Sequence, residues 1–194
     1  MDWLKNTPMK PLLLILALAL TVSAQAKRIG IDTEYDRFTD TTTIRNSQSI
    51  MPVRPGFVLF ETVAHIKGKY TPGVTPTEVA LRVESYSDRW VFLGQTNALR
   101  VLYNGSERYS LGTMRRIDAE VTERGVIEVL YLEVSMEAIE KLASAEKLEI
   151  QIGPLESEIK PEQRASIRKW LALFREKPRP VSSPLLRTSL TPCL

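Results

Sequence analysis

Hydrophobic and polar residues alternate with a period of two over most of the middle of the chain, the pattern of β-strands that bury one face. Segments rich in Gly, Pro, Asn and Asp separate the alternating runs. We expect turns and loops at residues 27–40 and 45–56, and no strand after Gly153-Pro154. The pattern predicts strands at Thr41–Ile44, Phe57–Lys67, Val79–Val83, both arms of Trp90–Gly112, Ile117–Val121, Val126–Val134 and Leu148–Ile152.

The segment Trp90–Gly112 contains the signature of a complete β-hairpin. Its Asn-Gly pair at 104–105 tolerates the positive φ angles that tight turns require. A two-residue loop would pair apolar with polar side chains across the hairpin. A three-residue loop over 104–106 instead sets Leu99 opposite Leu111 and Val101 opposite Tyr109, which lets one face be buried. We therefore predict the three-residue loop.

Two short helices are predicted late in the chain. Ser135 is a good N-cap for the first, in which Ile139, Leu142 and Ala143 share a face and which ends near Glu146. Pro161 suits the first turn of the second, whose apolar stripe is Ile167, Trp170, Leu171 and Phe174.

We expect this stripe to dock on the sheet, with the basic residues of the region solvated on the far side. A helix lying on a membrane or protein surface would show the same pattern. The basic residues are Lys160, Arg164, Arg168, Lys169, Arg175, Lys177 and Arg179.

These elements predict a mainly β protein, an antiparallel β-sandwich with two late α-helices. The alternative is an α+β antiparallel sheet with the helices on one face. The length suits a single domain over residues 27–177. Residues 178–194 are rich in Pro and Ser, and we expect a disordered tail that contributes nothing to folding.

The first 26 residues have the features of a secretory signal peptide. Lys5 and Lys10 precede the apolar run Pro11–Val22, which is too short to span a bilayer, and Ala24 and Ala26 form a cleavage site. No cysteine stands directly after the run, so soluble export is favoured over lipid anchoring. An uncleaved membrane anchor is the alternative. The mature chain, without a transmembrane segment, is expected in the periplasm or outside the cell.

The net charge of +3 conceals an asymmetry along the chain. Residues 27–159 carry 16 Lys and Arg against 20 Asp and Glu, whereas residues 160–194 carry 8 against 2. The basic end indicates either an anionic partner or a solvated helix face, and export disfavours nucleic acid. Cys193 is the single cysteine, so no internal disulfide is possible.

His65 is the single histidine, and alternation places it with Glu61 and Lys67 on the polar face of its strand. A general base or a metal ligand is conceivable, but the absence of another histidine or a nearby cysteine favours a surface histidine. A catalytic triad assembled in space is not excluded by spacing.

Carboxylates occur in two further places. Asp32, Glu34, Asp36 and Asp40 cluster in IDTEYDRFTD and resemble calcium ligands, but an EF-hand loop's glycine and final glutamate are missing, so a solvated segment is favoured. Glu128 and Glu133 lie five residues apart and face opposite sides of one strand. We expect rim positions or salt bridges for them, with burial against Arg100 or Arg82 as the alternative. We assign no catalytic, cofactor-binding or metal-binding residues.

The order of several segments resembles that of a group of exported bacterial β-sandwich proteins without a known activity. The segments are YDRFTDTTTI, FVLFETVAHIKGK, ALRVESYSDRWVFLGQTNALRVLYNG, VIEVLYLEVSMEAIEKLASAEKLEIQIG and the final helix, over Tyr35–Phe174. The resemblance implies a bacterial envelope or secreted setting and a sandwich fold. It carries no activity and no catalytic residue that could be transferred to positions in this chain.

The sequence therefore favours a non-enzymatic module that binds a protein or an envelope ligand. A structural component of the envelope and a hydrolase with an unrecognised site are the alternatives. His65 meeting two carboxylates in one concave pocket would favour the hydrolase, and a flat apolar patch on a sheet edge would favour the binding module.

Overall fold

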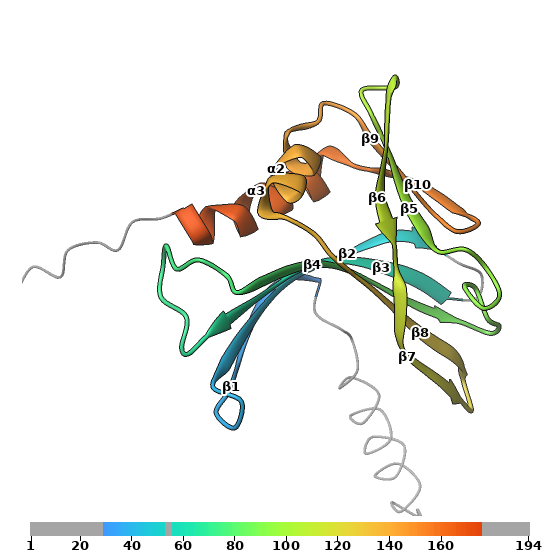
Figure 1. Ribbon diagram of the computed structural model, residues 1–194. Helices are drawn as coiled ribbons and strands as arrows, with labels where there is room; N and C mark the ends of the chain where they lie inside the picture. The colour runs from blue at the N-terminus through green and yellow to red at the C-terminus, as the bar shows by residue number, and fades with distance from the viewer. Residues whose placement is uncertain (1–28, 53–55, 176–194) are drawn as a thin grey trace, which may run out of the picture.

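Ten β-strands and two α-helices make up the part of the chain that the computed structural model describes, residues 29–52 and 56–175 (Figure 1). The signal segment with Ala24 and Ala26, the tail 178–194 with Cys193, and Lys177 and Arg179 lie outside these residues. Six strands form one antiparallel sheet in the order β1-β2-β3-β4-β8-β7. Their bounds are β1 Gly30–Asp36, β2 Thr41–Pro52, β3 Gly56–Lys67, β4 Glu78–Ser87, β7 Arg115–Thr122 and β8 Gly125–Glu133.

Four strands form a second antiparallel sheet in the order β10-β9-β5-β6. The two helices, α2 and α3, come late in the chain as predicted. This confirms the mainly β fold with two antiparallel sheets. The bounds are β5 Ala98–Tyr103, β6 Glu107–Thr113, β9 Leu148–Ile152, β10 Leu155–Ile159, α2 Met136–Ser144 and α3 Pro161–Arg175.

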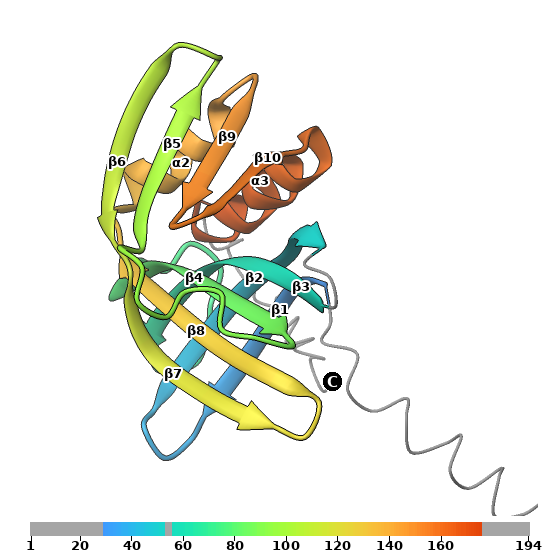
Figure 2. The same ribbon diagram turned by 90° about the vertical axis from the view of Figure 1, so that its right-hand side faces the viewer.

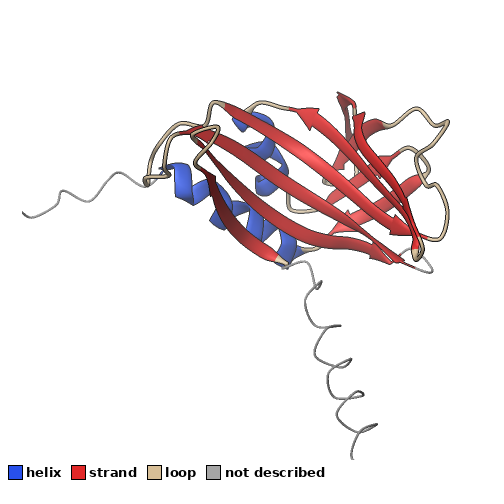
Figure 3. Cartoon of the chain, turned by 90° about the horizontal axis from the view of Figure 1, so that it is seen from below, coloured by secondary structure: helices blue, strands red, loops and turns tan. Residues whose placement is uncertain are grey.

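The four-stranded sheet and both helices lie on the same side of the six-stranded sheet (Figures 1 and 2). Seen from the opposite side, the strands of the six-stranded sheet face the viewer with the helices behind them (Figure 3). No other described element covers that second side. We call it the uncovered face.

The hydrophobic core fills the space between the two layers. Phe60, Leu81 and Leu130 enter it from the six-stranded sheet, and Leu99 and Ile150 enter it from the four-stranded sheet. Their strands alternate with a period of two, so each sheet directs one set of side chains to the core.

The second helix, α3, docks on the six-stranded sheet through Trp170, which is completely buried. The indole Nε1 donates a hydrogen bond to the Ile44 carbonyl oxygen at 3.3 Å, and Phe174 packs edge-on against the indole at 4.8 Å between centroids. Gln163 adds two links to β2: its Nε2 donates to the Ser49 carbonyl, and its own carbonyl accepts from Gln48 Nε2. The predicted docking of the apolar stripe is confirmed.

One basic residue of this helix is not solvated as expected. Arg164 is 6% exposed, and its guanidinium donates to the carbonyl oxygens of Ile159 and Glu146. It therefore links α3 to the end of β10 and to the connection between α2 and β9. Lys160, Arg168, Lys169 and Arg175 are exposed as predicted.

The first helix, α2, has the predicted cap, because the Ser135 side chain accepts a hydrogen bond from the Ala138 N–H at 3.1 Å. Ile139, Leu142 and Ala143 are its buried residues, as predicted. It packs beside α3, where Arg168 donates to the Ala143 carbonyl at 2.7 Å.

The β5–β6 hairpin has the predicted three-residue loop, with Val101 opposite Tyr109. Both Asn104 and Gly105 have positive φ, 51° and 75°. The expected pairing of Leu99 with Leu111 is wrong, since Leu99 lies opposite Gly112. A β-bulge at this point adds one residue to β6 and shifts the register.

Several strand boundaries differ from the prediction. The first arm of the hairpin was expected from Trp90, but residues 90–97 form a loop and β5 begins at Ala98; β4 continues to Ser87 instead of ending near Val83. Residues 30–36 form β1 instead of a turn-rich segment, and β2 continues to Pro52 instead of ending near Ile44. Gly153-Pro154 connects a further hairpin strand, β10, instead of ending the β region. These segments are polar or irregular in pattern, and pairing with a neighbouring strand stabilises them despite weak intrinsic preference.

We predict that Trp170→Ala lowers the free energy of unfolding by about 3–5 kcal/mol, the usual effect of truncating a buried aromatic residue. Urea unfolding of the purified variant measures this. The control is Lys169→Ala at the neighbouring exposed position, which should leave the midpoint within about 0.5 kcal/mol of the wild type. An unchanged midpoint for Trp170→Ala would contradict the docking.

Candidate functional site

The uncovered face is lined by the second set of alternating side chains of the six-stranded sheet. Cross-strand partners share a face, so the register identifies its members row by row. One central row runs Ser47, Glu61, Arg82, Tyr131 and Arg115, from β2 to β7. The face called polar from the sequence therefore exists, but its centre is more buried than expected.

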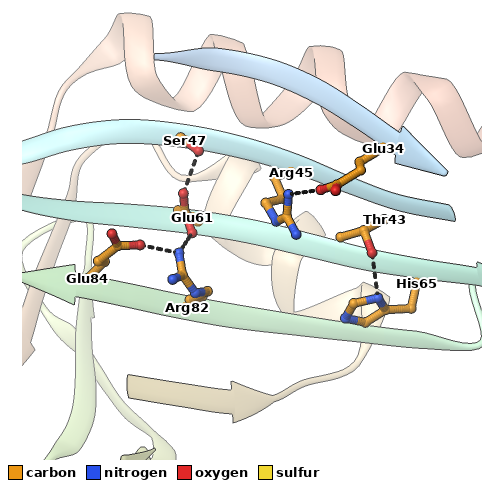
Figure 4. A network of polar contacts seen from close by, with 8 residues as sticks. All are labelled: Glu34, Thr43, Arg45, Ser47, Glu61, His65, Arg82 and Glu84. Atoms are coloured by element: carbon orange, nitrogen blue, oxygen red, sulfur yellow. Dashed lines mark hydrogen bonds and ion pairs between the residues drawn. The ribbon is translucent and has the colours of Figure 1, made fainter. Parts of the chain in front are cut away.

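Two buried carboxylates and one arginine form the centre of this face (Figure 4). Glu61 is completely buried and Glu84 is 4% exposed. The Arg82 guanidinium lies between them, forming an ion pair with each, at 2.5 Å for Glu84. Ser47 donates a hydrogen bond to Glu61 Oε1 at 2.5 Å.

The electrostatic consequences are visible in the pKa of Arg82. Burial alone would lower this pKa, but the two carboxylates outweigh burial, so it lies above its ordinary value. Arg82 therefore remains charged while it is partly removed from water. By formal charge, one cation faces two carboxylates at this centre.

Two tyrosines complete the buried part of the face. Tyr86 donates to Glu84, and Tyr131 donates to Glu78. Burial, and next these hydrogen bonds, raise the pKa of both phenols well above the ordinary value of 10. Both hydroxyls are therefore neutral hydrogen-bond donors at physiological pH.

His65 lies on the same face, as the alternation predicted, and is half-buried. Its Nδ1 lies 3.1 Å from the Thr43 hydroxyl, which is the one hydrogen-bond partner of the imidazole ring within the described residues (Figure 4). Glu78 on β4 lies opposite His65, and Glu34 on β1 lies opposite Thr43. The two cavities described below do not include His65, so these groups share a row of the sheet and not a pocket.

The acidic segment Asp32–Asp40 forms β1 and the turn after it, with all its carboxylates exposed. Glu34 forms an ion pair with Arg45 at 2.9 Å (Figure 4). Asp36 accepts from the Phe38 N–H and the Thr39 hydroxyl, and these bonds lower its pKa. Within residues 29–52 and 56–175, no group of three or more His, Cys, Asp or Glu side chains is arranged to hold a metal ion.

Glu128 and Glu133 lie on opposite faces of β8, as predicted, but Glu128 is not at a rim. It is completely buried on the core side and accepts hydrogen bonds from the Val91 and Phe92 N–H groups and from Arg116 at 3.2 Å. The expected rim position is wrong because the 88–97 loop folds over this end of the sheet, whereas the expected salt bridge is confirmed by the ion pair with Arg116. Glu133 is exposed, 3.9 Å from Arg115.

Two cavities lie outside the centre of this face. One, of about 500 Å³, is lined by residues of all four strands of the smaller sheet, including Arg100, Arg108 and Glu156. The other, of about 380 Å³, lies where the helices meet the start of β4. Its lining mixes apolar and polar residues, including Glu78 and the Glu140–Arg175 ion pair.

Comparison with known proteins adds no relative: no protein family, no curated protein and no solved structure matches the chain. Among the described helices, none is both long and apolar enough to cross a membrane. The candidate site therefore depends on the geometry of this chain alone.

Sequence reasoning missed the central ion-pair group. Arg82 was considered as a partner of Glu128 or Glu133, whereas its partners are Glu61 and Glu84. The signal that could have revealed it is the presence of charged residues within otherwise apolar strands. The ten-residue connection between β3 and β4 does not determine the register, so their pairing was not predictable.

We predict that Arg82→Leu lowers the free energy of unfolding by about 3–5 kcal/mol, because two carboxylates then remain buried without their cation. Arg45→Leu is the matched control on the same face. It removes a mostly exposed ion pair and should cost less than about 1 kcal/mol. Equal losses in the two variants, measured by urea unfolding, would show that the central group contributes no more than a surface pair.

We predict that stability falls as the pH rises above 10. The unfolded chain loses its tyrosine protons near pH 10, whereas Tyr86 and Tyr131 keep theirs in the folded protein, and burial raises the pKa of Tyr103 to about 12. The unfolded state therefore binds fewer protons in this range, and folding weakens. Urea midpoints at pH 9 and pH 11 test this. Tyr86→Phe should show a smaller drop, and equal midpoints at both pH values in the wild type would contradict the account.

Proposed function

We propose that this protein is a non-enzymatic binding module and that the uncovered face of the six-stranded sheet is its contact surface. The observation that carries the proposal is the combination of a wide sheet face, covered by no described element, with an organised set of polar and aromatic side chains. Sheets that bury only one face usually carry dispersed, solvated polar residues on the other. Here that second face has its own buried centre.

The chemistry of the face fits recognition better than catalysis. Arg82, Glu61 and Glu84 neutralise one another in part, and Tyr86 and Tyr131 are committed as donors to carboxylates. Groups held in this way present a fixed pattern of charge and hydrogen bonding to a partner. Such preorganisation lowers the entropic cost of binding.

Apolar groups are also available on this face. Phe57 is 36% exposed, and its ring lies 4.7 Å from that of Tyr86. Ile127, opposite Tyr86 on β8, is half-buried. Exposed aromatic and aliphatic surface beside polar groups is typical of protein contact sites. The proposed setting is the bacterial envelope or the exterior, on the basis of the N-terminal sequence.

We predict that Ser49→Trp abolishes capture of the native partner from an envelope extract, because Ser49 is exposed on this face and an indole there blocks access. The matched control is Ser110→Trp on the exposed surface of β6, which should retain the partner. Quantitative comparison of the proteins captured by the immobilised wild type and both variants is the measurement. Loss in both variants, or retention in both, would contradict the proposal.

A further inference from the structure

We propose that the partner of the uncovered face is a cationic, extended polypeptide segment. This inference rests on the proposed function and adds the chemistry of the partner. Its basis is the charge on this one face, counted from the strand registers. The basic residues are Arg45, Lys67, Arg82 and Arg115. The acidic residues are Asp32, Glu34, Asp36, Glu61, Glu78, Glu84, Asp118, Glu120 and Glu133.

Nine carboxylates against four cations give this face a formal charge of −5, or −3 when the buried Glu61 and Glu84 are left out, although the whole chain carries +3. The negative potential is therefore local to one surface and does not follow from the net charge. Complementary charge steers a partner and determines its orientation. A positively charged partner fits this face, and an anionic one is repelled.

The arrangement of the carboxylates identifies an extended ligand. They lie on all strands of the six-stranded sheet except β2. Adjacent strands are about 4.8 Å apart, so the charged surface from β1 to β7, the two edge strands, is roughly 24 Å wide. No group of them within the described residues is close enough to hold a metal ion. A chain with several Lys or Arg residues reaches many of these sites at once, whereas a small cation reaches one.

The aromatic end of the face suits the same ligand. Lys and Arg side chains place long aliphatic stems on apolar surface while the charge stays in water. The Phe57–Tyr86 pair provides such a surface in the same row as Glu120, with Ile127 between Tyr86 and Glu120. The face already contains one cation–aromatic contact, with Arg115 lying 5.8 Å from the Tyr131 ring.

Three carboxylates at the two sides of the face are available to a partner. Asp32 on β1, and Asp118 and Glu120 on β7, are exposed and form no ion pair within the described residues. Binding a cation at these positions breaks no existing interaction. They are therefore the best positions at which to test the inference.

The test is the affinity of a fluorescent decalysine peptide for the folded, purified protein, measured by anisotropy at low and at high salt. The variant Asp32→Asn/Asp118→Asn/Glu120→Gln removes three charges from the face. The control Glu137→Gln/Glu156→Gln/Glu158→Gln removes three exposed charges elsewhere. Each exposed pair contributes roughly a 1.5- to 5-fold change, so we expect about tenfold weaker binding for the variant and less than twofold for the control. Binding of the wild type should weaken as salt increases.

Equal weakening in variant and control, or none in either, overturns the inference. If decalysine fails to bind the wild type while Ser49→Trp still loses the native partner, the face is a contact surface whose partner is not cationic. That result overturns this inference and supports the proposed function. If the triple variant loses decalysine but Ser49→Trp keeps the native partner, the proposed function fails.

Discussion

A sheet of six strands has two faces, and residues 29–52 and 56–175 cover only one of them. The four-stranded sheet and both helices pack on the same side, and Trp170 lies completely buried at the contact with β2. Covering one side provides the apolar burial that stabilises the fold. It also leaves the second side of the strands to be stabilised by other means, and the proposed contact surface lies on that side.

The side chains of the uncovered face respond to this constraint with charge instead of apolar packing. Arg82 joins two buried carboxylates, and Ser47 and Tyr86 satisfy further oxygen atoms. Such a group adds little net stability compared with apolar residues, but breaking it is costly. A slip of one residue between β3 and β4 would separate Glu61 from Arg82 and turn a charge into the core. The group therefore opposes wrong registers of the central strands and also gives the face its charged centre.

The elements predicted from the sequence were those whose pattern is local. The strands β3, β4 and β8, the hairpin loop at Asn104–Gly105 and the stripe around Trp170 repeat with a clear period or use characteristic turn residues. The strand β1 was missed because its polar sequence acquires structure only by pairing with β2. The burial of Glu128 was missed because its partners lie in the 88–97 loop, about 36 residues away in the chain.

The candidate site was harder to predict than the fold for the same reason. Glu61, Arg82 and Glu84 are individually ordinary charged residues, and their meaning comes from a register that spans two strands. His65 was correctly placed on the polar face, but its neighbour Thr43 comes from another strand. A side chain's face can be derived from alternation alone, whereas its partners depend on contacts between distant segments.

Mapping of backbone amide chemical shifts in the isotope-labelled protein during titration with a cationic peptide tests the central claim most directly. The account predicts that the shifted amides lie along the strands of the six-stranded sheet, strongest near Asp32, Tyr86 and Glu120, with the four-stranded sheet unchanged. Shifts concentrated on β5, β6, β9 and β10, or spread evenly over the surface, would contradict it.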